Sequence, residues 1–335
     1  MMLIKDPDAI QDRWGRPPSQ RSMGELLEGG VIALDKPRGP TSHQATAWAR
    51  DAMGMKRLGH GGTLDPNVSG VLPLCCGKAM RLSDLVLSSD KEYVCLMRLH
   101  RERPEARIRE VMGNFQGRIF QFPPLRSAVK RQLRIRRVSE LEILEIDGRD
   151  VLFRVACDAG TYIRTLCTDI GEALGCGANM EELRRTRSGE MREEDSFTLH
   201  DVKDAYVLWQ QHGREDWLRS MVQPLESLLE PLPKVVAKAS AVDALCHGAD
   251  LHVPGVHMLD PDIRRNALVA VLSARGEAIG IGRMAMNSDR LMASSQGKAV
   301  LMERVLMERG RYPRMWTFAS DLPEVGFSDD GESDE

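Results

Sequence analysis

The chain has 335 residues, of which 42% are hydrophobic and 28% are charged, and its net charge is −3. These values are ordinary for a soluble globular protein, and the length favours two domains. No apolar run approaches the length of a membrane span, and residues 1–16 lack the apolar core of a secretory signal. We therefore expect a cytoplasmic protein without a membrane partner.

The cysteines exclude two classes of small-domain architecture. None of the seven forms a Cys-x-x-Cys pair; Cys75 and Cys76 are adjacent, and the other five are scattered. This spacing fits neither a disulfide framework nor a zinc ribbon, and it indicates buried, reduced thiols.

Charge is distributed unevenly along the chain. Residues 320–335 carry seven acidic residues and no Lys or Arg, so the rest of the chain has a net charge of +4. Residues 118–137 contain seven Lys or Arg and no acid. This basic block is a candidate phosphate-binding surface, although a solvated charged strand or loop explains it equally well.

Taken in chain order, the first predicted elements are an extended arm over residues 1–29 and a short apolar strand over residues 31–34. Thr41 or Ser42 can cap a following helix, whose apolar face includes Ala45, Ala47 and Trp48. Further strands are predicted at 71–76, 91–97, 141–146 and 151–157, and helices at 78–86 and 162–174. Consecutive strands indicate an α+β fold rather than alternating βαβ units.

A domain boundary is expected near Leu229 to Pro233, where prolines follow the end of a helix. Beyond it, residues 267–273 and 278–284 flank Arg275-Gly276 as a hairpin in a small β-rich domain. Gly280-x-Gly-x-x-Ala285 matches a dinucleotide-binding fingerprint, but its glycines fall inside a hairpin strand. We therefore interpret them as glycines of a tightly packed barrel.

The loop Gly59-His60-Gly61-Gly62-Thr63-Leu64-Asp65-Pro66 fits no helix or strand pattern. Glycines reach backbone conformations that other residues avoid, and Pro66 biases Asp65 away from helical geometry. A carboxylate presented in this way is a candidate nucleophile or general base. Taken alone, the same residues describe an ordinary turn. No second His or carboxylate lies at ligand spacing from His60, so zinc binding there is not expected.

Several ordered blocks resemble one family, the TruB/dyskerin RNA pseudouridine synthases, and most closely their archaeal guide-RNA-dependent type. The blocks are Leu34-Asp35-Lys36-Pro37, Gly59 to Pro66, Gly70-Val71-Leu72-Pro73, Lys91-Glu92-Tyr93, Pro123-Pro124 with Ser127 to Arg131, Gly160 to Leu166, and Leu183 to Gly189. His247-Gly248-Ala249-Asp250 and Val253-Pro254-Gly255 resemble a PUA domain. The resemblance covers roughly residues 20 to 316 and favours the functional interpretation of Asp65.

The resemblance implies a mixed, mainly antiparallel central sheet flanked by helices, followed by a small β-barrel-like PUA domain. The implied domains are an arm over 1–30 packed on the PUA domain, a catalytic domain over 31–232 and the PUA domain over 233–316. An acidic tail over 317–335 has the composition of a disordered segment.

The implied reaction is the isomerisation of uridine to pseudouridine in RNA, without a cofactor or metal. Asp65 would be the nucleophile, and Arg164 would pair with it and keep it ionised. Tyr93 would stack on the base and assist proton transfer, Leu183 would close the pocket, and His60 would support it. The nucleotide must be flipped into this site.

The implied partners are a box H/ACA guide RNA, substrate rRNA or tRNA, and small zinc-ribbon and glycine-arginine-rich-type H/ACA proteins. A kink-turn-binding protein would join through the RNA. The implied RNA-binding residues are Lys78, Arg126, Lys130, Arg131, Arg134, Arg136, His247 and Gly248. A guide-independent tRNA pseudouridine synthase acting on the TΨC arm and a non-catalytic RNA-binding scaffold stay open as alternatives.

Overall fold

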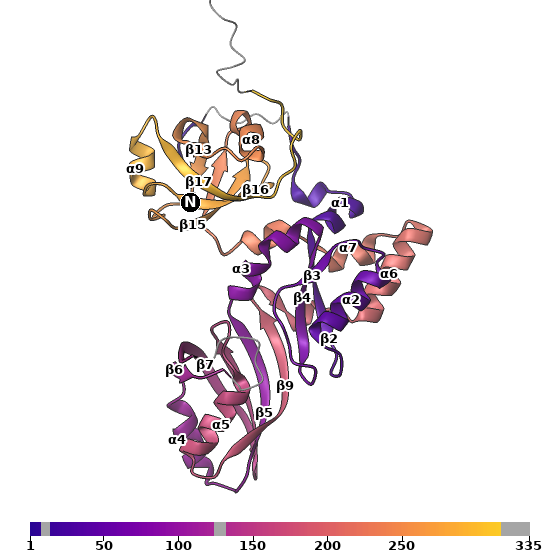
Figure 1. Ribbon diagram of the computed structural model, residues 1–335, viewed down its shortest axis with the longest axis vertical. Helices are drawn as coiled ribbons and strands as arrows, with labels where there is room; N and C mark the ends of the chain where they lie inside the picture. Colours follow the sequence, from indigo (N-terminus) through magenta and orange to yellow (C-terminus); the bar gives the residue numbers. More distant parts are fainter. Residues whose placement is uncertain (8–13, 124–131, 316–335) are drawn as a thin grey trace, which may run out of the picture. The chain divides into compact units, whose positions relative to one another are not determined.

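The computed structural model describes residues 1–7, 14–123 and 132–315. They form two compact units, one within Met1–Gln20 and Leu229–Glu335 and the other within Arg21–Leu228. Each unit contains its own sheet, and the elements are labelled in Figure 1. None of the helices in these described ranges has both the length and the apolar character needed to cross a membrane.

The larger unit is built on one mixed sheet with the strand order β11-β2-β4-β9-β5-β8-β7-β6. Its strands are β2 (Gly30–Lys36), β3 (Leu58–His60), β4 (Ser69–Cys76), β5 (Lys91–Leu99), β6 (Gly117–Gln121), β7 (Arg134–Asp147), β8 (Asp150–Cys157), β9 (Ala178–Ser188), β10 (Met191–Arg192) and β11 (Gln223–Pro224). Within the described residues, β4 and β9 run parallel and the other pairs in this sheet are antiparallel. The mixed, mainly antiparallel sheet expected from the sequence is confirmed.

Helices cover different ends of this sheet. They are α1 (Met23–Glu28), α2 (Ser42–Ala52), α3 (Ser83–Ser88), α4 (Glu105–Gly113), α5 (Ile163–Ala173), α6 (Leu199–His212) and α7 (Asp216–Met221). Figure 1 shows α4 and α5 beside the end formed by β5 to β8, and α2 and α6 beside β2 to β4. Large buried side chains such as Phe153 and Leu72 belong to two separate apolar clusters at these ends.

Two predicted helices differ in detail from the sequence interpretation. Thr41, one of the two predicted caps, begins α2 through a capping box with Gln44, but the buried face carries Ala45 and Ala49 while Trp48 is exposed. The expected face is therefore displaced by one residue. The helix predicted over 78–86 is a 3-10 turn (Gly77–Leu82) followed by α3, because the chain bends before Ser83.

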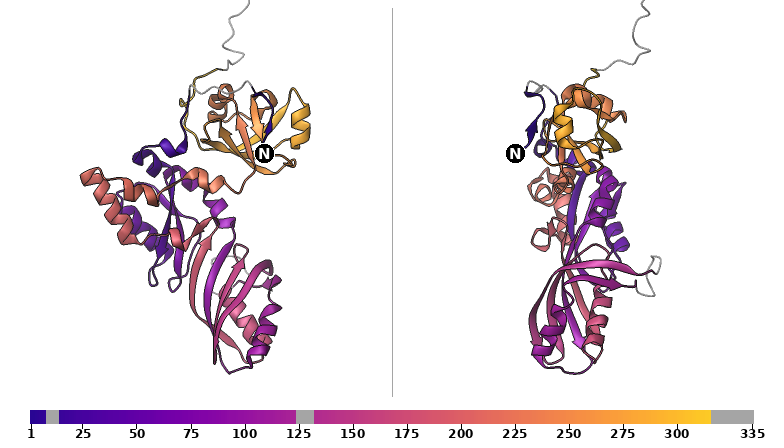
Figure 2. Two further views of the ribbon diagram at one scale, coloured as in Figure 1. Left: turned by 180° about the vertical axis from the view of Figure 1, so that it is seen from behind. Right: turned by 90° about the vertical axis from the view of Figure 1, so that its left-hand side faces the viewer.

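The predicted hairpin around Asp147-Gly148 is confirmed as β7 and β8, which pair antiparallel. The first strand begins earlier than predicted, at Arg134, because β7 also pairs with β6. The right-hand view in Figure 2 shows the β6–β7 ribbon projecting from the rest of the sheet. All seven cysteines are free, and all but Cys176 are buried.

The smaller unit contains a seven-stranded sheet in the order β1-β14-β12-β15-β16-β17-β13. Its strands are β1 (Leu3–Ile4), β12 (Lys234–Ala237), β13 (Leu251–His252), β14 (Val256–Leu259), β15 (Leu268–Ser273), β16 (Ala278–Met284) and β17 (Lys298–Val305), with helices α8 (Ala239–Cys246) and α9 (Ser288–Ala293). The predicted hairpin is confirmed as β15 and β16. A Cβ at Gly280 would lie 2.3 Å from the Arg304 carbonyl oxygen, so close strand packing explains this glycine.

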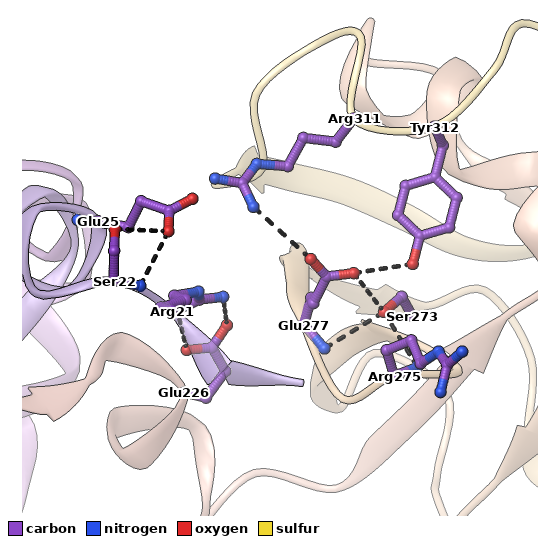
Figure 3. Close-up of polar contacts among 9 residues, drawn as sticks. All are labelled: Arg21, Ser22, Glu25, Glu226, Ser273, Arg275, Glu277, Arg311 and Tyr312. Carbon is purple, nitrogen blue, oxygen red and sulfur yellow. Dashed lines mark hydrogen bonds and ion pairs between the residues drawn. The ribbon is translucent and has the colours of Figure 1, made fainter. Parts of the chain in front are cut away.

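The arm predicted over residues 1–30 is divided between the two units. Leu3 and Ile4 extend the smaller sheet by pairing with β14, and Trp14 packs against the same core. Residues 21–30 instead belong to the larger unit, where α1 buries Met23, Leu26 and Leu27. The Ser22 and Glu25 capping box that starts α1 and the nearby Arg21–Glu226 ion pair are drawn in Figure 3.

A buried carboxylate organises one corner of the smaller unit. Glu277 is 1% exposed, and its Oε2 accepts hydrogen bonds from the Tyr312 hydroxyl at 2.8 Å and the Ser273 hydroxyl at 3.2 Å (Figure 3). Arg311 lies 3.7 Å from the other carboxylate oxygen. Burial raises the pKa of Tyr312 to about 12, so this phenol remains a hydrogen-bond donor at neutral pH. The cluster links the β15–β16 turn to the chain that follows β17.

Replacing Tyr312 with Phe is expected to lower the free energy of unfolding by about 1–3 kcal/mol, because the buried Glu277 carboxylate loses a donor. Tyr206→Phe is the matched control, since the Tyr206 hydroxyl has no hydrogen-bond partner among the described residues. Chemical denaturation of both variants measures the difference. Equal stability of the two variants would contradict this role for the Tyr312 hydroxyl.

Candidate active site

The loop between β3 and β4 carries Asp65, and its glycines are required by its path. Gly62 has a φ of +128°, a conformation that side chains with a Cβ rarely adopt. A Cβ at Gly61 would lie 2.5 Å from a Val86 methyl carbon. The unusual backbone path predicted from the sequence is therefore present, and larger residues at these two positions would displace the loop.

Two buried polar side chains hold the middle of the loop. Ser42, the first residue of α2, accepts a hydrogen bond from Leu64 N at 2.8 Å and donates one to Leu64 O at 3.0 Å. Lys36, at the end of β2, is fully buried and its Nζ donates to the carbonyl oxygens of Pro37, Pro40 and Pro66. These contacts fix the backbone on both sides of Asp65.

The Asp65 carboxylate forms an ion pair with Arg164, the second residue of α5. This is the pairing expected from the resemblance, and it joins residues 99 positions apart in the chain. The two side chains are 56% and 52% exposed. Ion pairs with this exposure typically contribute only about 0–1 kcal/mol to stability. The pair therefore orients the carboxylate more than it stabilises the fold.

Tyr93 lies on β5 directly opposite Arg185 of β9. Its side chain is largely buried in the apolar cluster that includes Phe153 and Ile163. Burial raises the pKa of the Tyr93 phenol, and the neighbouring positive charge of Arg185 acts in the opposite direction. Burial lowers the pKa of Arg185, which is 1% exposed, because desolvation disfavours its charged form. The phenol is thus protonated at neutral pH, with a buried cation beside it.

His60 ends β3 and is half-buried beside the exposed His43, with ring centroids 4.9 Å apart in an edge-to-face arrangement. Its Nδ1 is buried and has no hydrogen-bond partner among the residues that the structure describes. Burial lowers the pKa of His60, and His43 and Arg185 lower it further, so the ring is neutral at physiological pH. In the described part of the chain, no His, Cys, Asp and Glu side chains form a group that fits a metal ion.

The other predicted residues lie in different places. Leu183, on β9, is half-buried against the cluster around Tyr93. Arg134 and Arg136 lie two residues apart on β7, and the Arg136 guanidinium lies close to Gly160, which precedes α5. Lys78 follows β4, whereas His247 and Gly248 follow α8 in the smaller unit. Arg126, Lys130 and Arg131 lie outside the described residues.

The sequence interpretation assigned no role in the site to Lys36, Ser42 or Arg185, although all three belong to the blocks or caps that it named. A signal was present for two of them. Lys36 ends a strand whose first five residues are Gly or apolar, and Arg185 lies within β9 at a position that alternation assigns to the same face as Leu183. A cation at a buried strand position requires an explanation, because burying an ionised group is costly.

Known family models match most of the chain. Models of the TruB family pseudouridylate synthase N-terminal domain match residues 50–106 and 100–163, and a tRNA pseudouridylate synthase B C-terminal domain model matches residues 164–230. A PUA domain model matches residues 233–306, and a DKCLD domain model matches residues 1–46. A probable tRNA pseudouridine synthase B of Methanothermobacter thermautotrophicus is 52% identical, covering 90% of this chain and 94% of the relative. The chain belongs to the TruB family of pseudouridine synthases.

Other TruB-family relatives support the same assignment. A probable tRNA pseudouridine synthase B of Archaeoglobus fulgidus is 46% identical over 95% of this chain and 98% of its own length. A chain from a solved H/ACA RNP bound to a substrate RNA containing 2′-deoxyuridine superposes with a TM-score of 0.88 at 47% identity, covering 94% and 97% of the two chains. A chain from a crystal structure of a Cbf5-Nop10-Gar1 complex superposes with a TM-score of 0.88 at 50% identity, and the match covers 94% of this chain and 96% of that chain. This TruB-family protein is an RNA pseudouridine synthase with a C-terminal PUA domain.

We predict that Ser42→Ala lowers both stability and turnover. Removing the hydroxyl leaves the buried N–H and C=O of Leu64 unsatisfied, at an expected cost of about 1–3 kcal/mol. It also frees the backbone next to Asp65. Ser220→Ala removes an exposed hydroxyl that bonds Trp217 O and is expected to change stability by less than about 0.5 kcal/mol. Denaturant unfolding and single-turnover assays of both variants provide the measurement; indistinguishable variants would contradict the prediction.

Proposed function

We propose that this protein is the catalytic subunit of a box H/ACA ribonucleoprotein and isomerises uridines that a guide RNA selects. The observation that carries the chemistry is the Asp65–Arg164 ion pair in the same unit as the buried Tyr93. The choice of RNA partner is supported by the similarity, over 94% of the chain, to proteins from H/ACA and Cbf5-Nop10-Gar1 complexes. The match of residues 1–46 to the DKCLD model agrees with that choice.

The chemistry requires that the bond between the sugar and a uracil nitrogen breaks and a bond from the sugar to a uracil carbon forms. That carbon loses a proton and the released nitrogen gains one. In this proposal Asp65 is the nucleophile, and Arg164 orients its carboxylate through the ion pair. The half exposure of both side chains leaves the carboxylate open to substrate.

Tyr93 would stack against the target base and assist removal of the proton from carbon. Leu183, which packs against the same cluster as Tyr93, would limit access of water to the detached base. His60 would support the site as a neutral ring, consistent with its lowered pKa. The target nucleotide would be flipped out of its helix to reach these groups.

Cationic side chains would position the RNA without reading its sequence. In the larger unit these are Lys78, Arg134 and Arg136, together with Arg126, Lys130 and Arg131, which lie outside the described residues. Arg136 lies near the start of α5, the helix that carries Arg164. In the smaller unit, His247 and Gly248 would contact the guide RNA as part of the PUA domain, whose sheet is extended by the N-terminal strand β1.

The proposed partners are a guide RNA of the box H/ACA class, a substrate rRNA or tRNA, and proteins of the kinds present in the related Cbf5-Nop10-Gar1 complex. A second function, guide-independent modification of tRNA, is favoured by the names of the archaeal relatives, which are probable tRNA pseudouridine synthases B. Both activities can reside in one active site, because the chemistry on the uridine is the same. The two activities differ only in the RNA that presents the uridine to the site.

Asp65→Asn is expected to abolish pseudouridine formation, lowering the single-turnover rate by a factor on the order of 10⁴ or more, because the nucleophile is lost. RNA affinity should persist, since one carboxylate adds nothing to phosphate binding. Asp147→Asn is the control, because Asn-Gly is a favourable hairpin turn and this position lies far along β7. Near-normal turnover by Asp65→Asn would refute the assigned role.

Tritium release from labelled uridine is expected to require guide RNA and partner proteins for an rRNA substrate. The same assay with unguided tRNA tests the second function. Rapid release from rRNA without guide would contradict the guided role, and release from tRNA alone would show that the guide-independent activity is also present. The Asp65→Asn protein provides the background in every arm.

A further inference from the structure

Arg185 is the most unusual buried residue in the larger unit. The residue is 1% exposed, and its guanidinium donates from Nε to Val71 O at 2.7 Å and from Nη2 to Gly62 O at 3.3 Å. Among the described residues no carboxylate neutralises it, and burial lowers its pKa. Burying a charge without an opposite partner is unfavourable, so its presence calls for a role beyond packing.

Both hydrogen bonds hold the ends of the segment that carries Asp65. Gly62 lies three residues before Asp65, and Val71 lies six residues after it. The backbone of Arg185 contacts the same segment, because Gly70 pairs with Arg185 where β4 and β9 run parallel. A Cβ at Gly70 would lie 2.2 Å from the Arg185 carbonyl oxygen. One residue therefore fixes the start and the end of the Asp65 loop against β9.

The same residue lies opposite Tyr93. The register between β5 and β9 shifts between Glu92 and Tyr93, so that β9 has one extra residue, Thr186, at this point. Such a β-bulge re-aims the side chains next to it. It places Arg185 opposite Tyr93, and the Thr186 hydroxyl donates to the Glu92 carboxylate at 2.7 Å. The charge of Arg185 opposes the effect of burial on the pKa of Tyr93.

We propose that Arg185 is a positioning residue for the isomerisation. Its rigid guanidinium couples the Asp65 loop to Tyr93. The inference rests on the proposed roles of Asp65 and Tyr93. Lysine cannot replace it, because an ammonium group lacks the planar fork that reaches Val71 O and Gly62 O together. The chemistry is sensitive to such geometry, since a displacement of about 1 Å at a reacting group reduces rates by about 100-fold.

The test compares Arg185→Lys and Arg185→Gln with Arg187→Gln, a control on the same strand whose guanidinium donates a hydrogen bond to the nearby Gly189 O. Single-turnover rates with saturating RNA, RNA affinity and thermal unfolding are measured for each protein. Arg185→Lys should fold, bind RNA within about threefold of the parent protein and react about 100-fold more slowly. Arg187→Gln should react at the parental rate.

The pH profile distinguishes positioning from a structural role. Arg185→Gln removes the cation beside Tyr93, so the limb of the rate profile that reports the ionisation of Tyr93 should move to higher pH, whereas Arg185→Lys should move it less. In a Tyr93→Phe background, Arg185→Gln should add little further rate loss, because both changes affect one coupled unit.

Three outcomes would overturn the proposal. The first is a parental rate in folded Arg185→Lys, and the second is failure of that variant to fold. The third is an unchanged pH profile of Arg185→Gln together with a rate loss that adds fully to that of Tyr93→Phe. Asp65→Asn is assayed alongside. If that variant keeps its activity, the role of Asp65 in the proposed function fails, whatever the Arg185 variants show.

Discussion

The position of the Asp65 loop depends on contacts from four separate elements, and the arrangement of the candidate active site follows from that constraint. Lys36 of β2 and Ser42 of α2 bind the backbone beside Asp65, and Arg185 of β9 binds the ends of the loop. Arg164 of α5 then orients the carboxylate. A glycine-rich segment has much conformational entropy to lose, so this density of contacts is needed to hold one arrangement.

The charged side chains of the candidate active site contribute little to the stability of the fold. Lys36 and Arg185 are buried cations whose pKa values are lowered by desolvation, and Lys36 is stabilised in its charged form by the nearby Asp65. The exposed Asp65–Arg164 pair adds little to the free energy of folding. Natural proteins break local rules of this kind mainly at functional sites. Cations near a single carboxylate are also suited to a polyanionic substrate, because they attract phosphate groups.

The N-terminal residues illustrate how a short segment changes partners along its length. Leu3 and Ile4 form an edge strand of the smaller sheet, whereas α1 begins at Met23 and buries its apolar side chains in the larger unit. Both interactions remove apolar surface from water, which is the dominant favourable term in folding. The buried Glu277 cluster has a similar organising role in the smaller unit, where Tyr312 and Ser273 satisfy its carboxylate.

The sequence by itself determined the mixed α+β architecture, the β7–β8 and β15–β16 hairpins and the α2 cap, because these depend on local periodicity, turn residues and capping chemistry. Its ordered blocks also predicted Asp65, Tyr93 and Arg164 as a group. The exposed position of Trp48 and the division of the N-terminal arm were decided only in three dimensions, since burial depends on which elements pack together. The same holds for Arg185: its bonds to Gly62 and Val71 join residues more than one hundred positions apart. Only the register of β9 with β4 and β5 brings those residues together, because strand pairing is a long-range property that local sequence does not specify.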